Sequence, residues 1–156
     1  MPSKTLPTIV PTPVIDAAVV ARNLSALREQ RETAATVLAV PEMKRTGDPG
    51  QLVGWLGDAL YAAAVMTYAQ GFALLHRASR AYDFGLDLPT VARIWRGGCI
   101  IRAAVLEDIR TTLAANAERP NPLLHEGFAE LVNSRQDELR EVVRTAVAMG
   151  VPVPAL

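Results

Sequence analysis

Apolar residues recur at helical spacing along most of this chain. Ile15, Ala18 and Val19 follow the i, i+3, i+4 pattern of one helix face, with no proline or glycine between residues 14 and 38. Pro13 follows a threonine, a pairing typical of the first turn of a helix. The pattern predicts a first helix from Pro13 to about Leu38. No segment alternates apolar and polar residues for long enough to predict a strand.

Proline, glycine and capping residues divide the rest of the chain into further helices. A loop is predicted from Val40 to Gly50, and Asp87 is typical of an N-cap because a proline follows two residues later. Two adjacent glycines at 97 and 98 predict a turn. The predicted helices cover about 13–38, 51–82, 88–96, 100–115, 122–132 and 135–149. We therefore predict an all-α fold, a six-helix-type bundle. The predicted domain organisation is an irregular leader at 1–12 and a single domain at 13–156.

The longest apolar segment runs from Leu52 to Leu75, and its only formal charge is Asp58. Its length would satisfy a bilayer, which needs about 20 apolar residues. However, the segment is rich in alanine, contains three glycines and lacks the leucine and isoleucine density that favours insertion. We expect a core helix of a soluble protein, surrounded on all sides. The first 13 residues contain one lysine and no apolar stretch, unlike a signal peptide.

Composition restricts the classes of partner. The 156 residues fit one globular domain, and 16 Lys+Arg balance 16 Asp+Glu to a formal net charge of zero. This balance lacks the broad basic surface that binds nucleic acid or an anionic membrane, so we expect neither partner. The single cysteine cannot form an internal disulfide, and we expect a cytoplasmic protein.

Motifs for common cofactors are missing from these residues. There is no strand-associated G-x-G-x-x-G, no G-x-x-x-x-G-K phosphate loop and no His pair four residues apart. His76, His125 and Cys99 lie far apart in the sequence, whereas zinc ligands normally cluster. We therefore expect no bound cofactor and no metal site, and the catalytic residues stay unknown.

Arginines are the most informative polar residues, with 14 of them against 2 lysines. A planar guanidinium binds phosphate or carboxylate through two hydrogen bonds. Arg22 shares a predicted helix face with small apolar residues, and Arg96 and Arg102 flank the glycine pair. An arginine that is buried there needs an anionic partner, which is either a ligand or a protein carboxylate.

Three further residues are candidate ligand contacts, namely His76, Tyr68 and Gln70, all on the long apolar helix. For each, packing with an internally satisfied hydrogen bond is the common alternative, because buried polar groups usually bond to the backbone.

Four segments together resemble a known family. They are VIDAAVVARNLSALREQR, ALYAAAVMTYAQGF, IWRGGCIIR and QDELREVVRTAVAMGVPVPAL, in this order. They are similar to the C-terminal helical domain of 6-phosphogluconate dehydrogenase, and YAQGF with WRGGCIIR is a specific combination. The resemblance implies an all-α domain that supplies part of a substrate pocket and most of a dimer interface.

The resemblance also implies a ligand-binding role for one residue, and it shows which catalytic segments of the family have no counterpart here. Arg22 falls on the family's A-V-[FV]-A-R position, where the arginine contacts the phosphate of the sugar acid. The family's Rossmann domain, its H-N-G-I-E-Y-G-D helix, its K-G-T-G-[KR]-W segment and its F-Y-D-G-Y-R tail have no counterpart in these residues. Because hydride transfer needs a bound nicotinamide and a positioned acid and base, we expect no dehydrogenase activity from this chain alone.

Three functions follow as hypotheses. The first is an accessory or half-site subunit of a biosynthetic enzyme, a homodimer or a complex with a partner protein, which binds a phosphorylated or sulfated small molecule near Arg22. The second is a non-redox enzyme that uses Arg96, Arg102, His76 or Glu107 on such a ligand. The third is a structural interaction module, in which Arg22 pairs with a protein carboxylate such as Asp16 or Glu29. The same residues would also fit a shortened 6-phosphogluconate dehydrogenase.

Overall fold

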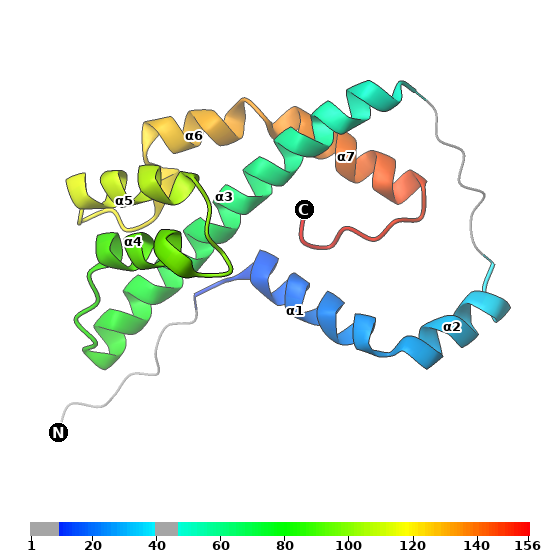
Figure 1. The fold of residues 1–156 in the computed structure, drawn as a ribbon, viewed down its shortest axis with the longest axis horizontal. Helices are drawn as coiled ribbons and strands as arrows, with labels where there is room; N and C mark the ends of the chain where they lie inside the picture. Colours follow the sequence, from blue (N-terminus) through cyan, green and yellow to red (C-terminus); the bar gives the residue numbers. More distant parts are fainter. Residues whose placement is uncertain (1–9, 40–46) are drawn as a thin grey trace. The chain divides into compact units, whose positions relative to one another are not determined.

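A computed structural model describes residues 10–39 and 47–156, and all the regular elements in these ranges are helices (Figure 1). The predicted all-α class is confirmed, although the helix count differs slightly from six. The helices are α1 (Pro13–Ala26), α2 (Arg28–Val37), α3 (Pro49–Tyr82), α4 (Leu88–Gly98), α5 (Val105–Ala115), a 3-10 helix η1 (Pro122–Leu124), α6 (Glu126–Asn133) and α7 (Gln136–Ala148). Residues 1–9 of the leader predicted at 1–12 lie outside the described residues, as do residues 40–46 of the loop predicted at 40–50.

The described chain divides into two compact units that share α3. One unit contains residues 65–130 and the short segment 10–12, and the other contains 13–64 and 131–156 apart from the undescribed loop. The single domain predicted for 13–156 stays a prediction.

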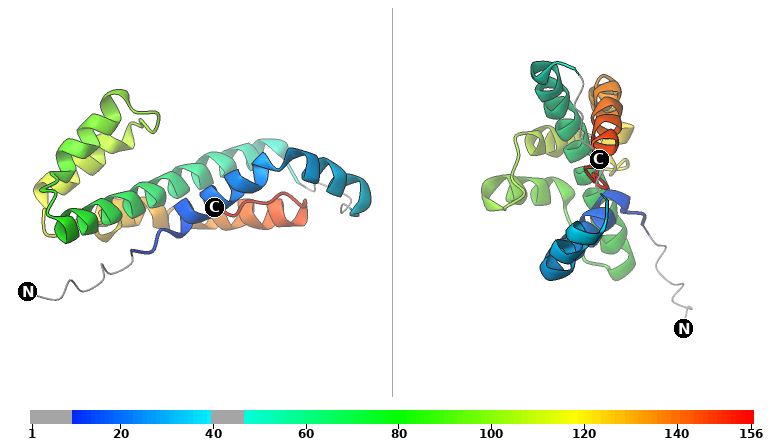
Figure 2. Two further views of the ribbon diagram at one scale, coloured as in Figure 1. Left: turned by 90° about the horizontal axis from the view of Figure 1, so that it is seen from below. Right: turned by 90° about the vertical axis from the view of Figure 1, so that its right-hand side faces the viewer.

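The unit of residues 65–130 has its core between α3, α4 and α5. Leu106 and Ile109 on α5 are fully buried, as is Phe72 on α3. The ring of Phe72 packs on Trp95 of α4 with 5.0 Å between the ring centroids. Figure 2 shows α4 and α5 lying side by side, so that both present their apolar faces to this core.

In the other unit, polar contacts join α7 to the N-terminal half of α3. Arg135, which precedes α7, forms an ion pair with Asp58 at 3.1 Å, and its guanidinium lies 5.3 Å from the centre of the Tyr61 ring. Both contacting residues of α3, Asp58 and Tyr61, lie before the middle of the helix. The cationic side chain thus fixes the start of α7 against one carboxylate and one aromatic face.

The N-cap predicted at Asp87 is confirmed. The Asp87 side chain accepts a hydrogen bond from the backbone N–H of Thr90 at 3.0 Å, and α4 begins at the next residue after Asp87. Asn121 caps η1 in the same way, since its side chain accepts from the N–H of Leu123 at 3.0 Å. These starts are predictable because the capping bond is local in sequence.

Three of the predicted helices have wrong boundaries. The helix predicted over 122–132 is divided into η1 and α6, because the backbone of His125 between them is extended. The single helix over 13–38 is broken at Leu27, whose backbone leaves the helical region and ends α1. The Arg31 guanidinium donates to the carbonyl of Ser25 at 3.1 Å, which satisfies one acceptor freed at the break. After the glycine pair the helix resumes only at Val105, so Ile100 and Ile101 lie in the turn, and Ile100 is 99% exposed.

The long helix α3 is not surrounded on all sides, contrary to expectation. Its buried residues form one stripe at helical spacing, Ala59, Ala62, Ala63, Val65, Ala69 and Phe72, whereas Val53 and Leu60 on other faces are 68% and 67% exposed. By length and composition, α3 is the one helix in the described ranges that is apolar enough to cross a bilayer, and 28% of its most apolar stretch is buried. A core helix of a soluble protein passes the same test. Too few elements of the chain pack around α3 to cover every face.

The stability of the 65–130 unit should depend on its buried isoleucine. Ile109→Ala is expected to lower the free energy of unfolding by about 2–5 kcal/mol, because it leaves a cavity in a fully buried site. The matched control Ile100→Ala removes the same atoms from an exposed side chain and should change it by less than about 0.5 kcal/mol. Urea unfolding measures both, and equal losses would contradict this account of the core.

Candidate functional site: an arginine-lined pocket and an exposed arginine

Three arginines line one open pocket of about 540 Å³ in the 65–130 unit. Arg93 and Arg96 come from α4, and Arg102 comes from the turn that follows it. The other lining residues are Gly97, Ala103 and Ala104, whose small side chains leave the guanidiniums as the main polar groups. The structure therefore brings together Arg96 and Arg102, two of the sequence-predicted ligand residues.

Sequence reasoning missed Arg93. Its signal was present, because Arg93 precedes Arg96 by three residues and residues at this spacing share one face of a helix. Arg93 lies one helical turn before Arg96 and so does not flank the glycine pair.

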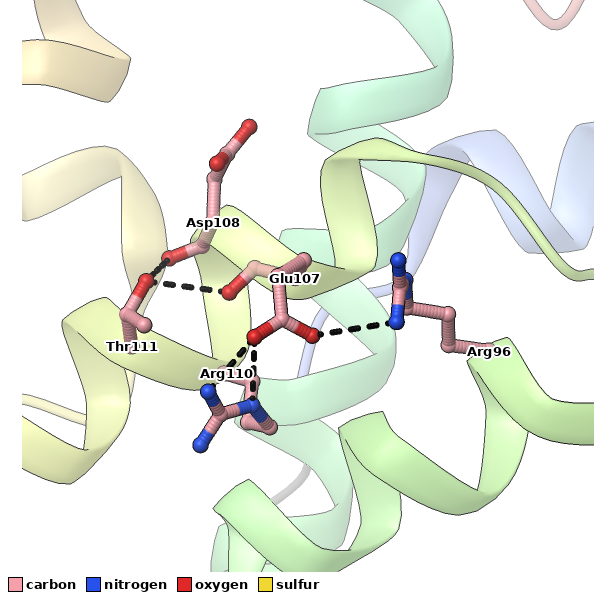
Figure 3. A network of polar contacts seen from close by, with 5 residues as sticks. All are labelled: Arg96, Glu107, Asp108, Arg110 and Thr111. Carbon is pink, nitrogen blue, oxygen red and sulfur yellow. Dashed lines mark hydrogen bonds and ion pairs between the residues drawn. The ribbon is translucent and has the colours of Figure 1, made fainter.

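A single carboxylate on α5 neutralises part of this positive charge. Glu107 Oε1 accepts hydrogen bonds from Arg110 Nε at 2.9 Å and Arg110 Nη2 at 2.5 Å, and Glu107 Oε2 lies 3.4 Å from Arg96 Nη1 (Figure 3). The hydrogen bond from Arg110 lowers the pKa of the Glu107 carboxyl below its usual value, against the effect of desolvation, and the charges of Arg110 and Arg96 add to this lowering. Arg110 is thus the main partner of Glu107, and Arg96 makes the longer contact.

Tyr68 fixes the turn that carries Arg102. From α3, its hydroxyl donates a hydrogen bond to the carbonyl of Ile101, the residue before Arg102. Burial raises the pKa of the Tyr68 phenol, and the nearby Cys99 adds to the effect, so the phenol stays protonated as a donor. Tyr68 therefore has a positioning role here, which is the packing alternative considered for it; a ligand contact stays a prediction.

The other predicted residues lie apart from this pocket. His76 is half-buried and lines a separate pocket of about 510 Å³ with Asp87, Pro89 and Leu113 among its walls. Gln70 is half-buried on α3 and makes an interaction within the protein. The candidate groups of the non-redox enzyme hypothesis are therefore not assembled around one cavity.

Arg22 lies on α1, in the other unit, and its environment differs from the expected one. The residue is exposed, and α1 has no buried residue at all. Among the described residues, no ion pair joins Arg22 to Asp16, Glu29 or any other carboxylate. The protein carboxylate required by the structural-module hypothesis is thus not present in this part of the chain.

Metal chemistry has no evident site in residues 10–39 and 47–156, because no three His, Cys, Asp or Glu side chains gather there. Cys99 is a half-buried free thiol. The described residues thus define an all-helical protein with an arginine-lined pocket.

Comparisons with known proteins identify its family. The family described as "6-phosphogluconate dehydrogenase, C-terminal domain" matches residues 2–156. A decarboxylating 6-phosphogluconate dehydrogenase of Synechocystis sp. is 42% identical over 146 residues, which are 94% of this chain and 30% of the relative. The NADP(+)-dependent decarboxylating 6-phosphogluconate dehydrogenase of Bacillus subtilis is also 42% identical, over 94% of this chain and 31% of the relative.

A solved structure gives the same result. The 6-phosphogluconate dehydrogenase of Plasmodium falciparum superposes with a TM-score of 0.87 at 32% identity, covering 94% of this chain and 32% of that chain. The chain therefore belongs to the family of the 6-phosphogluconate dehydrogenase C-terminal domain, as its motifs predicted. It spans about 30% of the length of the curated relatives it matches.

The Glu107 network should contribute to stability in a pH-dependent way. Because the folded-state pKa of Glu107 is lowered, its contribution is present above the unfolded-state value of about 4.3 and is lost as the pH falls through the folded-state pKa. Glu107→Gln should therefore flatten the loss of stability below about pH 4.5. Urea unfolding at several pH values measures this.

The control for that measurement is Glu118→Gln, which removes an exposed carboxylate that has no ion-pair partner in the described ranges. This variant should lose stability below about pH 4.5 as steeply as the unmodified protein does. An equally steep loss of stability in Glu107→Gln would contradict the proposed coupling between Glu107 and Arg110.

Proposed function

We propose that this chain is a helical subunit that binds an anionic small molecule, phosphorylated or sulfated, at Arg22 and performs no hydride transfer by itself. The observation that carries the proposal is the exposed Arg22 guanidinium, which has no ion-pair partner among the described residues. Its position matches the family arginine that the resemblance assigns to a phosphate contact. A guanidinium without an ion-pair partner in the described ranges can donate its hydrogen bonds to an external anion.

The redox part of the proposal follows from the residues present. Hydride transfer needs a positioned nicotinamide, an acid and a base. The described residues contain no strand, and a dinucleotide fingerprint lies between a strand and a helix. These residues span about 30% of the dehydrogenases they match. We expect the isolated 156-residue chain to produce no NADPH from 6-phosphogluconate and NADP⁺.

Exposed apolar surface supports an oligomer. On α1, Val20 and Leu24 are 58% and 57% exposed and recur at i and i+4, so they form an apolar stripe on one face of the helix, and Leu27, directly after α1, is 45% exposed. Contiguous apolar surface of this kind is typical of association sites. We propose that a second copy of the chain covers it in a homodimer; a different partner protein is the alternative. The neutral net charge suits apolar association.

The setting we propose is cytoplasmic, with the chain acting as an accessory subunit of a biosynthetic enzyme. The free thiol of Cys99 suits a reducing compartment. The proposal includes neither a nucleic acid nor a membrane as partner.

Loss of the Arg22 guanidinium should weaken ligand binding. For 6-phosphogluconate, measured by isothermal titration calorimetry, Arg22→Ala should raise the Kd about tenfold or more, because a charge-assisted hydrogen bond contributes about 1.5–3 kcal/mol. The matched control is Arg28→Ala, since Arg28 is exposed in the same unit but is paired with Glu32 at 2.7 Å. Equal Kd values for the Arg22 variant and the unmodified protein would remove the ligand role.

A charge on the α1 stripe should disrupt the oligomer. Leu24→Glu places a carboxylate within apolar contact surface and should shift the mass measured by light scattering from dimer toward monomer. Asn23→Glu adds the same charge at the neighbouring exposed position and should leave the dimer intact. A dimer of unchanged stability in the Leu24 variant would place the interface elsewhere.

A further inference from the structure

The pocket formed by Arg93, Arg96 and Arg102 carries an inference of its own. It is built entirely from residues of the 65–130 unit, so its chemistry does not depend on Arg22. Two of its guanidiniums project from one face of α4, at positions three residues apart. The third is brought to the same pocket by the turn between α4 and α5.

That turn is held by several hydrogen bonds. The backbone N–H of Cys99 donates to the Trp95 carbonyl at 3.4 Å, and the N–H of Arg102 donates to the Cys99 carbonyl at 3.1 Å. The Tyr68 hydroxyl binds the carbonyl of Ile101 from α3. The backbone at Arg102 is therefore fixed from two directions, so little ordering of the main chain is needed when a ligand binds.

The positive charge of the pocket exceeds what residues 10–39 and 47–156 neutralise. Arg96 shares Glu107 with Arg110, which makes the two shorter contacts. Arg93 and Arg102 have no ion-pair partner in the part of the chain that the structure describes. Figure 3 shows the Asp108 carboxylate directed away from Arg96 and Arg110. Of these four arginines, only Arg96 and Arg110 are paired with a carboxylate in the described residues, and both pair with Glu107.

The helix end explains only part of this charge. The C-terminus of a helix carries roughly half a negative charge and favours nearby cations. That is far less than the charge of the arginines at the end of α4, and like charges held together repel. A bound anion would relieve this repulsion.

The shape of the pocket favours a small, compact anion. Gly97, Ala103 and Ala104 line it without long side chains, and a Cβ atom added at Gly97 would meet nothing within 4 Å. A tetrahedral dianion offers three terminal oxygens to three guanidiniums, and each guanidinium can donate two hydrogen bonds.

We propose that Arg93, Arg96 and Arg102 form a second anion-binding site, separate from Arg22, which takes the phosphate group of a small phosphate monoester. Glu107 is the internal competitor of this ligand, because it holds Arg96 when the pocket is empty. The ligand replaces that contact and also engages Arg93 and Arg102.

Calorimetric titration of the full chain with glycerol 3-phosphate tests the site, at constant ionic strength with chloride as the counter-ion. Arg102→Ala should raise the Kd about tenfold or more, and Arg80→Ala, an exposed arginine of the same unit outside the pocket, should leave it unchanged. Glu107→Gln should lower the Kd severalfold, because the competing charge is removed. Far-UV circular dichroism establishes that each variant is folded.

Two comparisons make the result decisive. Arg22→Ala should not change glycerol 3-phosphate binding at this pocket, so failure of the Arg22 site and failure of this one are distinguishable. Amide chemical shifts at Gly97 and Ala103 should move on titration. The site is overturned if Arg102→Ala binds as the unmodified chain does or if those amides stay still. Binding of inorganic phosphate without binding of the ester would overturn the monoester as ligand.

Discussion

Small side chains along one face of α3 are the constraint on which both units depend. Ala59 and Ala62 are fully buried, and Ala69 is 2% exposed, so neighbouring segments approach the helix backbone closely. Further along the same face, Phe72 replaces the small residues and packs on Trp95. A larger residue within the alanine stripe would force the neighbouring segments apart, because a packed core does not absorb added volume without strain.

The arginine pocket is a consequence of this packing. The Phe72 and Trp95 contact fixes α4 against α3, and the Tyr68 hydroxyl on the same helix fixes the turn after α4. Together these contacts determine where Arg102 lies relative to the arginines of α4. The positions of the charged groups are thus set by apolar contacts and the hydrogen bond from Tyr68 to Ile101, not by the arginines themselves. The charge network with Glu107 is then free to exchange with a ligand.

The parts of the fold that the sequence predicted were those set by local interactions. Asp87 and Asn121 cap their helices through bonds to residues two or three positions away, and the family resemblance rested on contiguous motifs. The break at Leu27 could not be predicted, because no glycine or proline marks it. Glu107 and Arg110 are three residues apart and visible in the sequence as a pair.

Other features depend on the tertiary structure. The contact between Arg96 and Glu107 joins two helices. Both residues were candidates from the sequence, but their contact could not be predicted from it. The exposure of Arg22 was also unpredictable, since the small residues around it indicated a buried face that the single chain does not bury.

The central claim is that the chain forms an oligomer that binds a small anion. Native mass spectrometry of the protein recovered from its own host tests this claim most directly. The account predicts an oligomer that carries a small anionic adduct, and a bare monomer would contradict it.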